Sequence, residues 1–149
     1  MPIDPYLSNL YQEATFSKKL PLWGRLVVVL RGNLDRRGLE LIPHRSRAVR
    51  HGEVHELIAT DEATASPGQN VNAVANLGFV EFQSGGVLLV GDSVWICGRP
   101  FGHLVGFDLT HMPNHMNIVI SVSRAISGED LGLAPGSDIA FFMTSPGKD

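Results

Sequence analysis

The spacing of apolar residues changes once along the chain, after Pro21. Before this point, Asp4 can cap a helix that has Pro5 at its first position. Apolar residues then recur at i, i+3, i+4 and i+7, namely Leu7, Leu10, Tyr11 and Ala14. This pattern predicts one amphipathic helix over residues 5–17.

After Pro21 the apolar residues fall in short continuous or alternating runs, separated by Gly, Pro, Asn and Asp. These runs predict nine strands, at 25–30, 39–42, 54–60, 79–82, 87–90, 94–97, 103–109, 116–122 and 139–143. Such a series is typical of a closed or partly closed antiparallel β-barrel, with a sandwich as the alternative. Two short helical segments are also expected, at 71–77, ended by Gly78, and at 127–132, capped by Ser127.

No internal repeat or linker divides the sequence. We therefore predict a single domain over residues 1–149, made of the helix, a β-barrel over 22–144 and a tail over 145–149. The polar segment 61–72 fits either a binding loop or a solvated connection.

Composition excludes several classes of protein. With 44% hydrophobic and 18% charged residues the chain is not disordered, and no apolar run reaches the roughly 20 residues of a membrane span. The single cysteine and the lack of a secretion signal predict a cytoplasmic protein. A net charge of -3 gives no electrostatic reason to expect nucleic acid as a partner, and the common nucleotide-binding motifs are absent.

Three of the six histidines lie in residues 103–117, HLVGFDLTHMPNHMN. Proline and asparagine in Met112-Pro113-Asn114 favour a tight turn, and hence a hairpin. If the loop is these three residues, His111 and His115 form a directly opposed pair with Cβ atoms about 4.5–5.5 Å apart. Two such imidazoles can share a metal ion or act as an acid and base pair.

Counting in steps of two assigns the residues of this hairpin to two faces. The mixed face, which resembles the lining of a pocket, holds Phe107, Leu109, His111, His115, Asn117, Val119 and Ser121. The mostly apolar face, which resembles core, holds Asp108, Thr110, Met116, Ile118 and Ile120. A strict strand therefore separates Asp108 from His111. A carboxylate on the apolar face must be paired or must accept hydrogen bonds from backbone groups at the strand end.

A second group rich in polar residues, Arg50 to Glu56, overlaps the start of the strand at 54–60. A continuous strand would place His51, Glu53 and His55 on one face, as in non-haem iron sites. Alternatively, His51-Gly52 forms a two-residue turn that joins 46–50 to 53–59 and exposes His51.

These patterns lead to a set of candidate site residues. The catalytic candidates are His111, His115 and Asp108. The substrate-binding candidates are His55, His103, Asn114, Asn117 and Phe107. The candidate ligands of a divalent metal (Fe, Zn or Mn) are His111, His115 and His55.

We expect a small-molecule enzyme with a histidine-lined pocket at one end of the barrel. Acid–base or metal-assisted chemistry would support an isomerase, cyclase, dehydratase or hydrolase. The alternatives are a non-catalytic ligand-binding barrel and a structural or regulatory homo-oligomer with histidines at its interface. The expected partner is a small molecule, with neither nucleic acid nor membrane.

Overall fold

The computed structural model describes residues 16–144 of the chain. Within this part the regular structure consists of strands, and no helix is present. The twelve strands are β1 (Leu22–Val29), β2 (Asn33–Leu34), β3 (Leu39–Glu40), β4 (Ser46–Val49), β5 (Val54–Thr60), β6 (Asn70–Val71), β7 (Val74–Phe82), β8 (Gly86–Leu89), β9 (Ser93–Ile96), β10 (Arg99–Asp108), β11 (Asn117–Ser121) and β12 (Asp138–Phe142). The described residues contain no helix that is long and apolar enough to cross a membrane.

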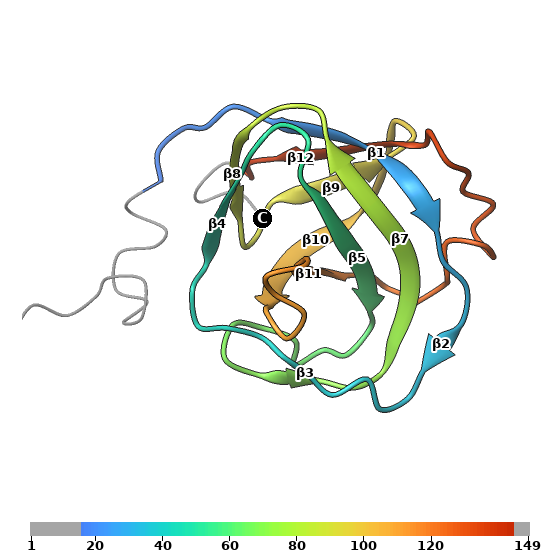
Figure 1. Cartoon of the computed structure of the whole chain (residues 1–149). Coiled ribbons are helices and arrows are strands. Elements are labelled where there is room, and N and C mark those ends of the chain that lie inside the picture. The colour runs from blue at the N-terminus through green and yellow to red at the C-terminus, as the bar shows by residue number, and fades with distance from the viewer. Residues whose placement is uncertain (1–15, 145–149) are drawn as a thin grey trace, which may run out of the picture.

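Eight of these strands form one large mixed sheet in the order β1-β12-β9-β10-β11-β5-β7-β2 (Figure 1). β1 also pairs with β7, so β1 has a neighbour on each side, β12 and β7. The expected all-antiparallel arrangement is wrong at one place, because β11 and β5 run parallel. A parallel pair needs a long crossover connection, and here strands β6 to β10 lie between the two in sequence.

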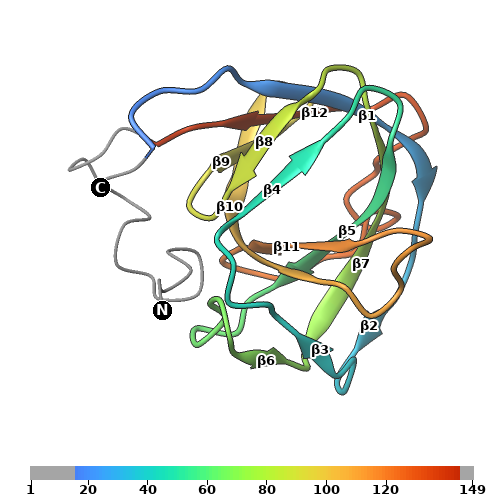
Figure 2. The same ribbon diagram turned by 60° about the vertical axis from the view of Figure 1, so that its left-hand side comes forward.

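Two small sheets lie beside the large one, β3 with β6 and β4 with β8 (Figure 2). β4 precedes β5 through a turn at His51 and Gly52, in which the Glu53 N–H donates to the Arg50 carbonyl at 3.2 Å. Gly52 has a φ of 89°, a value that suits glycine. The two-residue turn is therefore confirmed, and the continuous strand through His51 is wrong.

The apolar side chains pack in two clusters on opposite faces of β5 and β11. The larger cluster includes Leu57 and Ile118, together with Phe82, Phe107 and Phe141. The smaller cluster includes Ile58 and Val119, together with Leu39, Leu41, Val71 and Val74 from the β3–β6 side. β5 and β11 are therefore buried on both faces, and a polar side chain on either strand must find a partner inside the protein.

The three expected helical segments have different outcomes. The helix over 71–77 is wrong, because Val74–Phe82 forms β7 and is largely buried on both faces, which removes the alternation that marks a strand. The segment 127–132 forms turns, and Ser127 Oγ accepts the Asp130 N–H at 3.2 Å, as expected of a cap. Most of the helix over 5–17 and the whole tail over 145–149 lie outside the described residues, and residues 16 and 17 are not helical.

Candidate functional site

The predicted hairpin joins β10 to β11, but its loop spans residues 109–116 rather than three residues. Asp108 lies opposite Asn117, and Phe107 lies opposite Ile118. The expected faces are therefore wrong by one residue, since a slip of one position moves every side chain of a strand to the other face. Asp108 and Asn117 share a face, and Phe107 is fully buried in the larger apolar cluster.

Residues directly opposite each other form a row across four strands. Glu56 on β5 has Phe79 of β7 on one side and Asn117 of β11 on the other, and Asn117 is followed by Asp108 of β10. Because opposed residues point to the same face, this row lies at the end of the smaller apolar cluster. Glu56 is 6% exposed, and Asn117 and Asp108 are fully buried. Three adjacent buried polar residues therefore mark this end of the sheet.

Asp108 is held by hydrogen bonds from the protein itself. Its Oδ2 accepts the Glu40 N–H at 2.7 Å, and its Oδ1 accepts the Thr110 N–H at 2.9 Å and Asn117 Nδ2 at 3.1 Å. Burial alone would raise the pKa of Asp108, but the hydrogen bonds from Glu40, Thr110 and Asn117 outweigh it and hold the pKa below its usual value. The carboxylate thus fixes the strand end, the structural role considered above.

The carboxylate of Glu56 lies between two cationic or potentially cationic side chains. Its Oε2 is 3.4 Å from an Arg37 guanidinium nitrogen, and its Oε1 is 3.5 Å from His115 Nε2. The same Arg37 nitrogen is 3.4 Å from Asn76 Oδ1. The side chains of Glu56 and His115 are only 8% and 13% exposed, so water screens this pair weakly.

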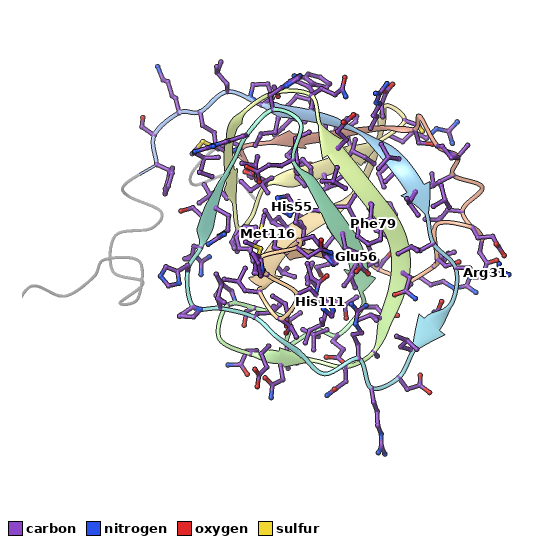
Figure 3. All side chains as sticks on the ribbon, in the orientation of Figure 1. Arg31, His55, Glu56, Phe79, His111 and Met116 are labelled. Atoms are coloured by element: carbon purple, nitrogen blue, oxygen red, sulfur yellow. The ribbon has the colours of Figure 1, made fainter. Side chains whose placement is uncertain are left out.

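His115 is enclosed by three neighbours in addition to Glu56. Its Nδ1 lies 2.9 Å from Asn114 Nδ2, its ring meets the Phe79 ring edge to face at 5.1 Å, and its ring lies 5.2 Å from that of His111. An Asn114 amide that donates to Nδ1 places the ring proton on Nε2, toward Glu56. His111 itself is exposed. The structure therefore brings His111 and His115 together, although not as opposed strand residues. Figure 3 labels His111 together with Glu56 and Phe79.

His55 belongs to a different environment, although it is adjacent to Glu56 in sequence. Its Nδ1 accepts the Met116 N–H at 3.0 Å, and its Nε2 lies 2.7 Å from Glu53 Oε1. Partial burial alone would raise the pKa of Glu53, but the hydrogen bonds from His55 and from the Arg50 N–H outweigh it and lower the pKa below its usual value. Because neighbouring strand residues point to opposite faces, His55 packs against Phe82 of the larger cluster.

Two buried polar atoms, one in the row and one in the loop above it, have unused hydrogen-bonding capacity. Asn117 Oδ1 and His115 Nε2 are inaccessible to solvent and make no hydrogen bond within the described residues. His115 Nε2 has only its longer contact with Glu56. Buried polar atoms of this kind are uncommon, and a catalytic role is one of the explanations for them. His115 Nε2 flanks the carboxylate of Glu56, and Asn117 lies opposite Glu56 on the neighbouring strand.

The remaining predicted site residues do not join this cluster. His103 is exposed on β10, opposite Ser121 and Ser93, well before the strand end that carries Asp108. In the part of the chain that the structure describes, no group of three His, Cys, Asp or Glu side chains is placed to hold a metal ion. His55 therefore does not supply the third ligand that the expected metal site requires.

Arg37, Glu56 and Phe79 are components of the cluster that were not predicted. A signal for Glu56 exists in the sequence, because this carboxylate directly precedes the apolar run Leu57-Ile58-Ala59 of a strand that is buried on both faces. Arg37 and Phe79 give no comparable signal, since their places depend on the pairing of β5 with β7 and on the path of the chain before β3.

Fold and site together define a mainly β protein with a buried polar row beneath a histidine-bearing hairpin loop. The chain belongs to DUF6917, a family of unknown function, whose model matches residues 16–142. No curated protein and no solved structure matches the chain.

Proposed function

We propose that the protein is a small-molecule enzyme that carries out acid–base chemistry at the loop between β10 and β11. The observation that supports this proposal is the position of Glu56, a buried carboxylate with Arg37 at one oxygen and His115 at the other. His115 in turn packs against the exposed ring of His111. A carboxylate that orients an imidazole beside an accessible imidazole is an arrangement suited to proton transfer.

In this proposal each residue has a separate task. His111 takes a proton from the substrate and returns it at another atom, because its ring is the exposed one of the pair. His115 and Glu56 are positioning residues, which fix the His111 ring through the contact between the two imidazoles. Phe79 and Met112 provide apolar surface near the rings, since Met112 is 39% exposed and Phe79 contacts His115. A partly apolar substrate would fit this surface. Reactions of this kind include isomerisation, cyclisation and dehydration.

We also infer that the large sheet closes on itself as a barrel, with this loop at one end. The supporting observation is that β1 pairs with both β12 and β7, so that the pairings from β1 through β12, β9, β10, β11, β5 and β7 return to β1. Clusters of polar residues at the ends of barrel strands are common ligand sites.

The test is turnover of small molecules from a metabolite extract, followed by mass spectrometry. The wild-type protein should convert at least one compound into a product of equal mass, or into one that differs by a water molecule. His111→Ala should slow this conversion by about 10²–10⁴, the usual contribution of a placed acid or base. His51→Ala is the matched control, because His51 is exposed in the turn before β5 and should not affect turnover.

One further variant separates catalysis from positioning. Glu56→Gln should reduce turnover less than His111→Ala and should shift its pH profile, since a neutral amide then faces His115 in place of the carboxylate. Circular dichroism establishes that each variant is folded. Turnover by folded His111→Ala at the wild-type rate would contradict the proposal, as would an extract left unchanged by the wild-type protein.

A further inference from the structure

A second candidate site lies on the outer surface of β1, β12 and β9, on strands that carry none of the histidine cluster. β12 runs between β1 and β9 (Figure 1). A hollow of about 430 Å³ opens there. Its lining consists of Trp23, Trp95, Gly98, Asp138, Ala140 and Phe142. Three of these six residues are aromatic, and one is charged.

The register of the strands explains why a hollow forms at this place. Trp23 lies directly opposite Ala140, and Ala140 lies directly opposite Trp95. Neighbouring strands are about 4.8 Å apart, so the backbones of the two tryptophans are separated by roughly 10 Å. The small side chain of Ala140 between them leaves the space that a larger residue would fill.

β12 supplies both ends of the hollow. Asp138, Ala140 and Phe142 alternate along the strand and therefore point to the same side. The Phe142 ring is nearly perpendicular to both indoles, at 89° and 5.4 Å from Trp23 and at 80° and 6.2 Å from Trp95. Asp138 lies two strand positions from Ala140, on the side away from Phe142. Aromatic rings thus occupy three sides of the hollow and a carboxylate the fourth.

The carboxylate of Asp138 is available to a ligand. It makes no hydrogen bond or ion pair with any described side chain. Arg25 lies directly opposite Asp138 on β1, but its guanidinium binds Glu81, at 3.2 Å. The hollow therefore keeps one unneutralised negative charge beside its aromatic walls.

We propose that this hollow binds a small organic cation of the quaternary ammonium type. The faces of aromatic rings attract cations, tryptophan most strongly, and a nearby carboxylate adds a direct charge interaction. A sugar, the other ligand that stacks on tryptophan, needs several hydrogen bonds. The lining supplies few of them, because Asp138 is its one charged side chain and Trp95 Nε1 already donates to Ser93 Oγ at 3.0 Å.

Intrinsic fluorescence tests this proposal directly, because both tryptophans of the chain line the hollow. The wild-type protein is titrated with choline, with its uncharged carbon isostere 3,3-dimethylbutan-1-ol, and with glucose. Choline should change the fluorescence in a saturable way. The isostere should bind about tenfold more weakly, which corresponds to the cation–π and charge contribution. Glucose should bind more weakly than choline.

Variants of the hollow sharpen the test. Asp138→Asn should weaken choline binding several-fold and leave the isostere unaffected, whereas Asp130→Asn, an exposed carboxylate in a turn, should change neither. Ala140→Leu should abolish binding because it fills the floor. His111→Ala should leave choline binding intact, which keeps this result separate from that of the proposed enzyme activity. Equal binding of choline and isostere, tighter binding of glucose, or no saturable change with any probe would overturn the proposal.

Discussion

Asp108 and Asn117 lie directly opposite each other on β10 and β11, and Asn117 Nδ2 donates a hydrogen bond of 3.1 Å to Asp108 Oδ1. The same carboxylate accepts the backbone N–H groups of Glu40 and Thr110. The Asp108 side chain on β10 thus contacts three other parts of the chain. These are β11 through Asn117, the start of the loop 109–116 through Thr110, and β3 through Glu40.

Removal of this carboxylate should destabilise the protein strongly. Asp108→Ala leaves three donors without an acceptor, of which Asn117 Nδ2 is buried and the other two are partly buried, and a buried donor left in this way costs about 1–3 kcal/mol. Because the losses overlap, we expect the free energy of unfolding in urea to fall by roughly 3–5 kcal/mol. Asp35→Ala, at an exposed position, is the control and should change it by less than about 0.5 kcal/mol. An Asp108→Ala protein as stable as this control would contradict the assigned hydrogen bonds.

Asp108 should also make the stability depend on pH in a defined direction. Its pKa in the folded protein is below the usual value of 3.8, so its contribution is complete above that value and disappears as the pH falls through the folded pKa. Urea unfolding between pH 7 and pH 3 should therefore show a smaller acid-induced loss in Asp108→Asn than in the wild type. Glu53, whose pKa is also lowered, acts in the same direction, and Glu53→Gln should show the same change.

Lys19 and Asp92 form a buried ion pair whose pH dependence has the opposite sign. Lys19 Nζ is 2.9 Å from Asp92 Oδ2, and the two side chains are 8% and 0% exposed. Burial raises the pKa of Asp92 despite the opposing effect of Lys19. Its contribution is therefore complete below the usual value of 3.8 and is lost as the pH rises through the folded pKa.

Loss of one partner of this pair should be more harmful than loss of both. Lys19→Met leaves the Asp92 carboxylate buried without a cation and should cost about 3–5 kcal/mol at pH 7. The cost should shrink at acid pH, where Asp92 becomes protonated. The double variant Lys19→Met/Asp92→Asn should recover most of the loss. A double variant less stable than Lys19→Met would show that the two side chains are not coupled in this way.

The hydrogen bonds of His55 predict a particular tautomer. Nδ1 accepts the Met116 N–H, so the ring proton resides on Nε2 and is donated to Glu53. Long-range ¹H–¹⁵N correlation spectra should show an Nε2–H imidazole at neutral pH. His55→Asn can keep an acceptor near the Nδ1 position, so it should be less destabilising than His55→Ala. Equal losses in both variants would argue against the Met116 hydrogen bond.

Strand positions were largely predictable from the sequence, whereas their pairing was not. Each of the nine expected runs contributes to an observed strand, because apolar runs between turn residues carry a local signal. The strands without an expected run are β2, β4 and β6. β2 and β6 have two residues each, and strands this short have little pattern to recognise. The parallel pairing of β11 with β5 depends on contacts between residues about sixty positions apart, which no local pattern encodes.

The candidate site shows the same division between local and long-range information. The rings of His111 and His115 meet, but within a loop and not as the directly opposed strand pair that the turn chemistry of Pro113 and Asn114 predicted. The exact loop length did not follow from it, and a register error of one residue assigned Asp108 and Asn117 to opposite faces. Arg37 reaches Glu56 only through the folded path of the chain.

The position of β1 in the sheet has a consequence for the order in which the protein folds. Its first residues pair with the last strand of the described chain, since Leu22 lies opposite Phe141. During synthesis β1 is made first, yet its β12 neighbour is made last, so one of its edges stays unpaired until nearly the whole domain has been translated. Non-local pairing of this kind makes folding slow compared with that of helical proteins of the same size. The nascent chain therefore exposes the outward-facing Trp23 together with an open strand edge until β12 has been made.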